Sequence, residues 1–563
     1  MGEIYTRFQE KFLLTTRVER PTLYDRSQHK SWVLFETNMS EEQKRQLETQ
    51  LWNVANTLRG RMHADEYRNY ILGFIFYKYL SERLASYVDE KLLASEPFSF
   101  VEVDEQTDEG VQVLNEIQKA TLGHLGFFLK PSQLFSRLVK KGKGEIDGES
   151  DFILEDLKSV LNTIEQTSSG TDSEDDFRGL FSDVDLTSNK LGGSEKEKNE
   201  VISEVLSHLS EIDFNLEDTK GDLLGDAYEY LIGKFAAGAG KQAGEFYTPS
   251  QVSRLLSRIV TAGKKRIKSV YDPSCGSGSL LLRVSEYVDV VDYYGQELNP
   301  TTHNLARMNM ILHGVHFAHF DIRRGDTLTN DLHPDLKAEA IVANPPFSAK
   351  WKSDTDPVLA QDDRFVQYGR LAPKNKADYA FVTHMIHHLA DNGTMATVLP
   401  HGVLFRSGAE GTIRQYIIEK LNYLDAVIGL PANIFYGTSI PATVCVFKKC
   451  RKSDDDILFI DASREFEKEK NQNNLLDDHI EKIFDTYINR KEIEKYSHCA
   501  SLDEIKENDF NLNIPRYVDT FEKEEPIDIN AVACELKKLQ AEEVEIQKKL
   551  AAFCEELGIE KPF

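Results

Sequence analysis

The chain has 563 residues, of which 40% are hydrophobic and 28% are charged. That composition is typical of a soluble globular protein, and the length predicts roughly two to four domains. The most apolar stretch, residues 71–80, is about half the length that a membrane-spanning helix needs. The N-terminal sequence MGEIYTRFQE lacks the pattern of a secretory signal. We therefore expect a cytoplasmic protein with no membrane partner.

Charge and cysteine content narrow the function further. The six cysteines form no CxxC pair, so the sequence predicts neither a disulfide framework nor a zinc ribbon. The formal net charge of −26 should repel a polyanion on average, because nucleic-acid binding depends on Lys and Arg that neutralise phosphates. A nucleic-acid enzyme of this composition would need its basic groups gathered in one cleft, or a second subunit that supplies most of the contacts.

The N-terminal part of the chain is predicted to be helical. Residues 1–38 differ in composition from the residues after them and are treated as an N-terminal extension without an assigned role. Residues 39–220 are predicted to form an all-helical domain, because apolar residues recur there at helical spacing. The helices expected in this domain and just beyond it cover about 40–58, 65–93, 131–138, 152–163, 195–209 and 221–235.

The pattern changes near residue 238, where short β-branched runs begin to alternate with helical patterns. Residues 221–465 are predicted to form the catalytic domain. Its expected strands are 267–271, 290–295, 317–322, 340–343, 394–399, 424–428 and 442–447. Such alternation predicts a doubly wound, mostly parallel α/β sheet of the Rossmann-like type. Residues 466–563 are predicted to be a C-terminal helical region, with a long helical tail from about residue 522.

A glycine-rich turn follows the first predicted strand. The residues of interest in it are Asp272, Cys275, Gly276, Ser277, Gly278 and Ser279. A Gly-x-Gly turn between a strand and a helix lets a ligand approach the backbone closely. A dinucleotide site would need a third glycine where Leu281 stands, which argues against a pyrophosphate ligand. By itself such a turn also occurs as a plain tight connection.

An acidic residue, Glu297, stands at the end of the next predicted strand. At this distance from the glycine turn, a carboxylate can accept hydrogen bonds from both ribose hydroxyls of a nucleoside. A solvated carboxylate at a strand end is the simpler alternative. Turn and acid together favour a site for a nucleoside-containing cofactor.

The third element is the peptide Asn-Pro-Pro-Phe at 344–347, which follows an apolar run. Pro345 and Pro346 fix φ and exclude helix, so the carbonyl groups of this peptide point in set directions. The Asn344 side-chain oxygen and the Pro345 carbonyl oxygen can accept the two N–H bonds of an exocyclic amino group. That localises the nitrogen lone pair toward a methyl donor. Phe347 offers a face for base stacking, and a base in duplex DNA would have to be flipped out to reach it.

Upstream, residues 244–250 read Gly-Glu-Phe-Tyr-Thr-Pro-Ser after a segment rich in Ala and Gly. The pair Gly240 and Lys241 in that segment does not make a phosphate-binding loop. Such a loop needs Gly where Phe235 stands and Ser or Thr where Gln242 stands.

These motifs, in this order, resemble the modification subunit of type I restriction–modification systems. They are GEFYTPS (244–250), DPSCGSGSLLL (272–282), QELNP (296–300), GDTL (325–328) and NPPFS (344–348). The helical stretch at 51–84 and the segment at 509–518 resemble the two ends of that subunit. The resemblance therefore covers the chain from about residue 39 onward.

The resemblance implies roles for individual residues. The methionine end of the cofactor would be lined by Glu245, Phe246, Tyr247, Thr248, Pro249 and Ser250. The cofactor turn would consist of Asp272, Cys275, Gly276, Ser277, Gly278 and Ser279, with Glu297 at the ribose and Asp326 at the adenine ring. The catalytic residues would be Asn344, Pro345, Pro346 and Phe347. Many family members carry Arg at the position of Ser250, so a contact of that side chain is not implied.

The implied activity is transfer of a methyl group from S-adenosylmethionine to N6 of a flipped-out adenine in duplex DNA. The implied partners are DNA, a specificity subunit that chooses the target, a second copy of this chain in a complex of two modification subunits and one specificity subunit, and a restriction subunit in the full endonuclease. Two alternatives stay open. One is N-methylation of RNA or of a protein glutamine, and the other is a non-catalytic interaction protein, which would predict damaged motifs.

The C-terminal tail carries apolar residues in the 3–4 spacing of a coiled coil. They are Ile529, Val532, Leu536, Leu539, Ile546, Leu550, Phe553 and Leu557, with Glu543 as a charged interruption. No helix-turn-helix or zinc-finger pattern that could read a DNA sequence is recognisable in the chain. The tail is therefore expected to contact helices of the specificity subunit, and the alternative is a helix packed on its own chain.

Three histidines, His384, His387 and His388, share one face of a predicted helix. They lack the carboxylate of a metal-binding HExxH helix, and methyl transfer needs no metal. We expect them to be structural and expect no metal site.

Overall fold

The computed structural model describes residues 41–58, 64–214, 223–238, 248–353, 356–435, 440–452, 455–469, 472–520 and 528–562. The chain divides into two compact units, Met1–Val518 and Asp519–Phe563. The predicted extension at 1–38 lies outside the described residues, as do the predicted site residues Glu245, Phe246 and Tyr247. Within the described residues, no helix is both long and apolar enough to cross a membrane.

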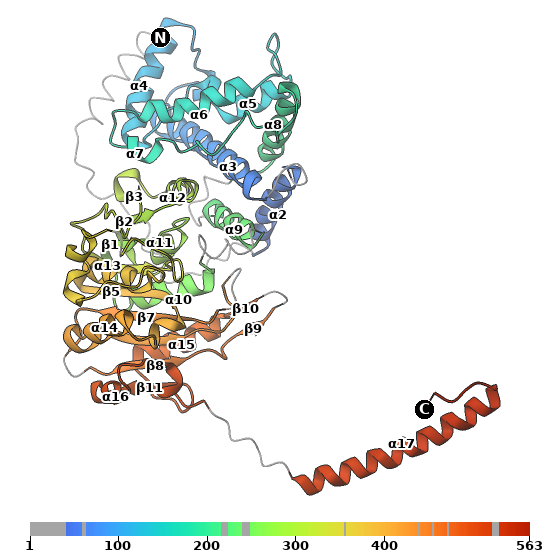
Figure 1. Cartoon of the computed structure of the whole chain (residues 1–563). Helices are drawn as coiled ribbons and strands as arrows, with labels where there is room; N and C mark the ends of the chain where they lie inside the picture. Colours follow the sequence, from blue (N-terminus) through green and yellow to red (C-terminus); the bar gives the residue numbers. More distant parts are fainter. Residues whose placement is uncertain are drawn as a thin grey trace. The chain divides into compact units, whose positions relative to one another are not determined.

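Helices form the N-terminal part of the first unit (Figure 1). They are α2 (Glu41–Leu58), α3 (Ala64–Tyr87), the π-helical turn Val88–Leu92, α4 (Asp108–His124), α5 (Phe135–Gly142), α6 (Leu154–Ser168), α7 (Glu174–Phe177), α8 (Glu195–Ser210) and α9 (Leu223–Gly238). Helix α3 is buried on most sides and lies at the centre of this core. Helix α4 is absent from the predicted helices; its N-cap Thr107 accepts a hydrogen bond from the N–H of Gly110.

The helical part and the α/β part share a core at α12 (Pro300–Leu312). The apolar side chains that α12 adds to the helical core are Leu305, Met308 and Leu312. Arg307, which is 2% exposed, donates to the backbone carbonyls of Asp175, Asp176 and Arg178. Helix α9 belongs to the same core although it follows residue 220. Because the helical core continues past residue 220, the packing does not test the domain boundary at that residue, which stays a prediction.

A nine-stranded sheet organises the rest of the first unit. Its strands are β1 (Arg266–Asp272), β2 (Asp289–Glu297), β3 (Phe320–Arg324), β4 (Ala338–Ala343), β5 (Leu389–Pro400), β6 (Leu424–Gly429), β7 (Ala442–Lys448), β8 (Ile457–Asp461) and β11 (Ser497–Ala500). The seven predicted strands are all present. The third begins three residues later than expected, because Phe317–His319 form a 3-10 turn. Strand β11 lies within the region assigned as C-terminal and helical, and a small hairpin joins β9 (Glu467–Lys468) to β10 (Asn473–Asn474).

The strand order is β11-β8-β6-β7-β5-β4-β1-β2-β3. Strands β3, β2, β1, β4 and β5 pair in parallel, whereas β7 is antiparallel to both β5 and β6. The chain runs outward from β1 to β3 and then returns to the other side of β1 at β4. Ligands of open α/β sheets bind outside the carboxyl ends of the strands at such a reversal.

Both faces of the sheet are covered. Residues of β4 alternate between two buried clusters, with Ala340 and Val342 in one and Ile341 and Ala343 in the other. The first cluster includes α10 (Ser250–Thr261), α11 (Ser279–Val284) and α15 (Asp477–Asn489). The second includes α13 (Asp378–His388), α14 (Ala409–Tyr416) and α16 (Leu502–Glu507). A doubly wound α/β sheet after an N-terminal helical part confirms the predicted fold class.

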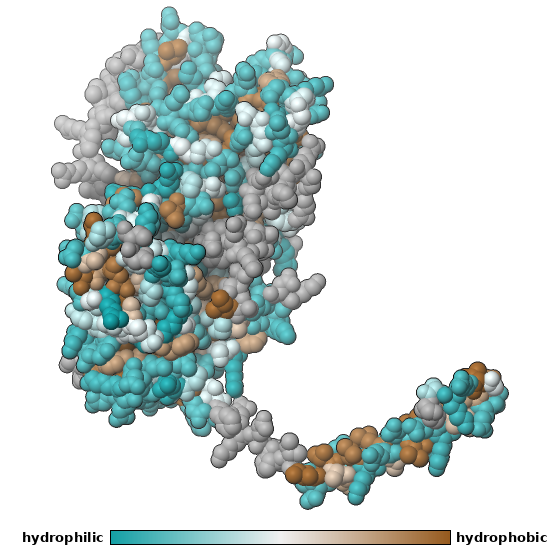
Figure 2. Space-filling model, in the orientation of Figure 1, coloured by the Kyte–Doolittle hydropathy of each residue, from teal (hydrophilic) through white to brown (hydrophobic). Residues whose placement is uncertain are grey.

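The second unit contains the helix α17 (Ile529–Leu557). The Asp528 side chain caps its start by accepting from the N–H groups of Asn530 and Ala531, and Gly558 ends it in the left-handed conformation. The eight apolar residues predicted to form a seam are between 42% and 77% exposed. Figure 2 shows brown, hydrophobic surface along this helix beside teal, hydrophilic surface.

Candidate active site

The predicted cofactor turn stands at the end of β1. Gly276 has φ 55° and Gly278 has φ 78°, both in the left-handed region that favours glycine. A Cβ atom on Gly278 would also lie 3.2 Å from the Met310 side chain of α12. The N–H of Cys275 donates to the carbonyl of Gln296 on β2, so the turn is attached to the neighbouring strand. Glycine is therefore required here by both backbone conformation and close packing.

Glu297 is held against this turn. Its two carboxylate oxygens accept the N–H of Gly276 at 3.0 Å and the N–H of Asn299 at 2.8 Å. A carboxylate offers about four lone pairs, so further acceptor sites remain for hydroxyl groups of a ligand. Burial raises the pKa of Glu297, and the backbone hydrogen bonds oppose that rise. The structure thus brings together two elements that are far apart in the sequence.

Several side chains of the turn are buried and stabilise it from within. Asp272 is 2% exposed and accepts the N–H of Ser274 at 2.9 Å. Burial raises the pKa of its carboxyl to about 8. Burial also raises the pKa of the Cys275 thiol, which is 5% exposed. The hydroxyls of Ser277 and Ser279 lie 3.0 Å apart and are likewise buried. These residues can therefore meet a ligand mainly through their backbone groups.

The loop after β3 closes on the same turn. The Thr327 hydroxyl donates to the carbonyl of Pro273 at 2.6 Å, and the N–H of Gly325 donates to the carbonyl of Glu297 at 3.0 Å. Asp326 between them is half-buried. The buried Arg364 supports this loop by donating to the carbonyls of Thr327 and Leu328. Arg364 was not predicted as a site residue, because no local pattern connects it with residues 325–328.

Asn344 follows directly after β4. Its Nδ2 donates to the Thr248 hydroxyl at 3.2 Å, so the Oδ1 acceptor of the amide is not used by this contact. Pro345 is buried, while Pro346 and Phe347 are half-buried. The ring of Phe347 meets that of Phe435 in a T-shaped arrangement, with centroids 6.0 Å apart. Thr248 and the Asn-Pro-Pro-Phe peptide are therefore neighbours.

The described part of the GEFYTPS motif leads into α10. The carbonyl of Pro249 accepts hydrogen bonds from the N–H groups of Val252 and Ser253. Ser250 is the first residue of α10 and is half-buried. At the start of this segment, the hydroxyl of Thr248 contacts Asn344.

The predicted histidine group is part of a buried hydrogen-bond network. Asp331, His384 and His388 bring potential metal-ligand atoms within 4.8 Å of one another. His384 contacts the Tyr271 hydroxyl at 2.8 Å and Arg364 at 3.1 Å. His388 contacts the Leu336 carbonyl at 3.0 Å and Asp331 at 2.9 Å. All four ring nitrogens of His384 and His388 have protein partners. His387 is half-buried, and the structural role of the three histidines stays a prediction.

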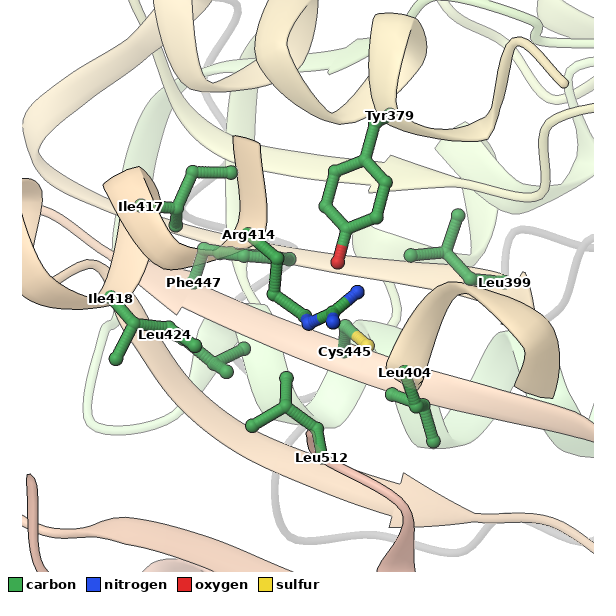
Figure 3. A pocket seen from close by; sticks show the side chains of 10 residues that line it. All are labelled: Tyr379, Leu399, Leu404, Arg414, Ile417, Ile418, Leu424, Cys445, Phe447 and Leu512. Carbon is green, nitrogen blue, oxygen red and sulfur yellow. The ribbon is translucent and has the colours of Figure 1, made fainter. Parts of the chain in front are cut away.

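A small cavity of about 10 Å³ lies away from these motifs, on the α13 and α14 side of the sheet. That is near the least space that holds one water molecule. Figure 3 shows its lining, which includes the Tyr379 ring, the Arg414 side chain and several apolar side chains. Arg414 donates to the carbonyls of Val403 and Phe510. The cavity is thus a packing feature around a buried, hydrogen-bonded guanidinium.

Comparisons with known proteins agree with this geometry. A family model described as N-6 DNA methylase matches residues 219–526, and one described as the HsdM N-terminal domain matches residues 47–209. The chain belongs to the N-6 DNA methylase family. It is 36% identical to the type I restriction enzyme MpnII methylase subunit of Mycoplasma pneumoniae over 92% of this chain and 97% of that one. It is 32% identical to the HindI methylase subunit of Haemophilus influenzae, over 73% of this chain and 89% of that one.

A solved structure is also similar. The type I restriction–modification system methyltransferase subunit from Streptococcus thermophilus matches with a TM-score of 0.77 and 44% identity, over 85% of this chain and 100% of that chain. The resemblance inferred from the motifs is confirmed. This methylase is a modification subunit of the type I kind, an adenine-specific DNA methyltransferase that uses S-adenosylmethionine. The alternatives of RNA or glutamine methylation and of a non-catalytic protein are not favoured.

Proposed function

We propose that this methylase transfers the methyl group to N6 of an adenine flipped out of duplex DNA, at the reversal point between β1 and β4. One observation carries the proposal. The Asn344 amide, oriented by Thr248, follows the strand next to the one that ends in the glycine turn, and Glu297 is hydrogen-bonded to that turn. The acceptors for an amino group and the binding site for a cofactor thus lie together at the edge formed by the carboxyl ends of the strands.

The residues at this edge fit S-adenosylmethionine, which supplies an activated methyl group on a positively charged sulfur. Gly276 and Gly278 let the backbone approach the cofactor, since a Cβ at either position would oppose the left-handed conformation. Glu297 would accept hydrogen bonds from the ribose hydroxyls with its remaining lone pairs. Asp326 would meet the adenine ring of the cofactor. Thr248, Pro249 and Ser250, with Glu245, Phe246 and Tyr247, would line the methionine end.

The catalytic peptide would activate a weak nucleophile. The lone pair of an exocyclic amino group is delocalised into the ring, so the nitrogen attacks slowly by itself. Asn344 Oδ1 and the Pro345 carbonyl would accept its two N–H bonds and stabilise the positive charge that develops on it. Pro346 would hold the carbonyl direction, and Phe347 would stack on the flipped base. Flipping is required because the duplex hides N6 from any active-site pocket.

We further propose that sequence choice comes from a partner. In a type I restriction–modification system, this chain would act with a specificity subunit and with a second copy of itself. In the endonuclease it would also act with a restriction subunit. Three features support the proposal: the net charge of −26, the missing DNA-reading motif, and the exposed apolar seam of α17. An exposed seam of this length needs another helix to cover it.

The decisive experiment measures tritiated methyl incorporation into duplex DNA with and without the specificity subunit, followed by nucleoside analysis. We expect label in N6-methyladenine that depends on the partner. A chain that ends before Ile529 should lose complex formation and, with it, methylation. Asn344→Ala should retain cofactor binding, measured by calorimetry, and lose methylation. Equal loss of both, or sequence-specific methylation by the isolated chain, would contradict the proposal.

A further inference from the structure

The residue after the catalytic peptide has an unusual backbone conformation. Ser348 has φ 51°, in the left-handed region that residues with a Cβ atom adopt only at an energetic cost. Such conformations persist where the surrounding structure imposes them, and they gather at functional sites. Because Ser348 follows Phe347 directly, its conformation determines the direction in which the chain leaves the peptide.

One buried carboxylate holds Ser348 in place. Asp378, the first residue of α13, is 1% exposed. Its Oδ1 accepts the N–H of Ser348 at 2.7 Å, and its Oδ2 accepts the Ser348 hydroxyl at 3.3 Å. The adjacent N–H of Ala377 donates to the carbonyl of Ala349 at 3.0 Å. The start of α13 is thus bound to two successive residues of the loop that leaves the catalytic peptide.

The negative charge of Asp378 is balanced by Arg406. The Nη1 of Arg406 donates to Asp378 at 3.1 Å and to the buried Glu410 at 2.9 Å. Gly402 leaves room for this guanidinium, since a Cβ atom there would collide with it. A buried carboxylate keeps its charge only with such pairing, so Asp378 and Arg406 act as one unit.

Helix capping does not account for this arrangement. A carboxylate in the first turn of a helix interacts favourably with that helix's own N–H groups and dipole. Asp378 instead directs both oxygens to Ser348, which lies thirty positions earlier in the chain and outside α13. The contact therefore serves the loop after Phe347.

We propose that Asp378, paired with Arg406, is a positioning residue for methyl transfer. It holds Ser348 in the left-handed conformation and thereby sets the Asn344 and Phe347 side chains for the target base. This inference rests on the proposed role of that peptide. Asp378 acts through Ser348, and we assign it no contact with cofactor or DNA.

The test uses the complex with the specificity subunit and its target duplex. Asp378→Asn keeps the shape of the side chain but removes the charge that pairs with Arg406. We expect kcat to fall about 10- to 100-fold, the effect of losing one charge-assisted hydrogen bond, and KM for S-adenosylmethionine to stay within about twofold. Adding Ser348→Gly should recover at least about half of that loss on a logarithmic scale, because glycine adopts the same φ without the carboxylate.

A matched control is available at Asp425, which is 4% exposed on β6. It accepts hydrogen bonds from the Tyr487 hydroxyl and from Arg490, whose φ is 47°. Asp425→Asn should lower Tm at least as much as Asp378→Asn, because Asp425 also pairs with Lys448 at 2.9 Å, and it should leave kcat unchanged. The comparison separates loss of positioning from general loss of stability.

A second readout reports on the base directly. The fluorescence of 2-aminopurine at the target position rises when the base leaves the stack, and it should rise less with Asp378→Asn than with wild type. Unchanged kcat in Asp378→Asn, or an equal fall of kcat in Asp425→Asn, would overturn the inference. A wild-type complex without methylation would instead overturn the proposed function, and this inference with it.

Discussion

Thr248→Val should lower the rate of methyl transfer without weakening cofactor binding. The Thr248 hydroxyl accepts a hydrogen bond of 3.2 Å from Nδ2 of Asn344, and both side chains are half-buried. This bond anchors the Asn344 amide in the observed orientation, in which Nδ2 and not Oδ1 faces Thr248. Valine preserves the shape of threonine and removes the hydroxyl, so the amide loses its preference. A rotated amide would present N–H groups to an amino group that also donates.

The size of the effect follows from the bond that is lost. A neutral hydrogen bond contributes a net free energy of about 0.5–1.5 kcal/mol. If that free energy serves only to orient the amide, kcat should fall about 2- to 13-fold, since each 1.36 kcal/mol corresponds to a factor of ten. Thr248 would also line the methionine end of the cofactor, but valine keeps the shape of that surface, so cofactor affinity should change by no more than about twofold.

Single-turnover methylation in the complex with the specificity subunit gives the rate, and calorimetry gives the dissociation constant of S-adenosylmethionine. Thr248→Ser keeps the hydroxyl and is the matched control, expected to retain most of the rate. The reasoning is refuted if Thr248→Val turns over like wild type, or if Thr248→Ser loses as much. A weaker cofactor affinity at unchanged rate would assign Thr248 to binding and not to the orientation of Asn344.

Two further predictions concern stability. Arg307→Met should reduce the free energy of unfolding by about 1–3 kcal/mol, measured by urea titration, because it leaves the buried Asp176 carbonyl and the part-buried Asp175 and Arg178 carbonyls without this donor. No measurable loss would contradict this role. Burial raises the pKa of Asp272 to about 8, so the folded chain retains a proton that the unfolded chain releases near pH 4. In the absence of cofactor, the free energy of unfolding of the wild type relative to that of Asp272→Asn should therefore fall as pH rises from about 4 to about 8. Above that pH the difference should level off. A difference that is flat or rises over this range would show that the carboxyl is ionised in the folded state.

Most of the fold could be predicted from local patterns. Runs such as 340–343 and 442–447 are short, apolar and β-branched, and both are central strands. Strand β11 was missed because it is a four-residue edge strand with the mixed sequence Ser-His-Cys-Ala. Helix α4 was missed because polar residues dominate it, and just four of its residues are buried. Short or mostly polar elements depend on their neighbours and leave little periodic signal.

The sequence by itself predicted the chemistry, because the proposed roles of the glycine turn, Glu297 and the Asn-Pro-Pro-Phe peptide each depend on a few adjacent residues. Tertiary structure decided which distant residues support them. Thr248 reaches Asn344, Asp378 holds Ser348, and Arg364 supports the loop around Asp326. Local spacing predicts which residues share the face of a helix or strand, since helical and strand periods are fixed. Contacts between separate loops depend instead on strand order and on the reversal at β1 and β4, which no local pattern encodes.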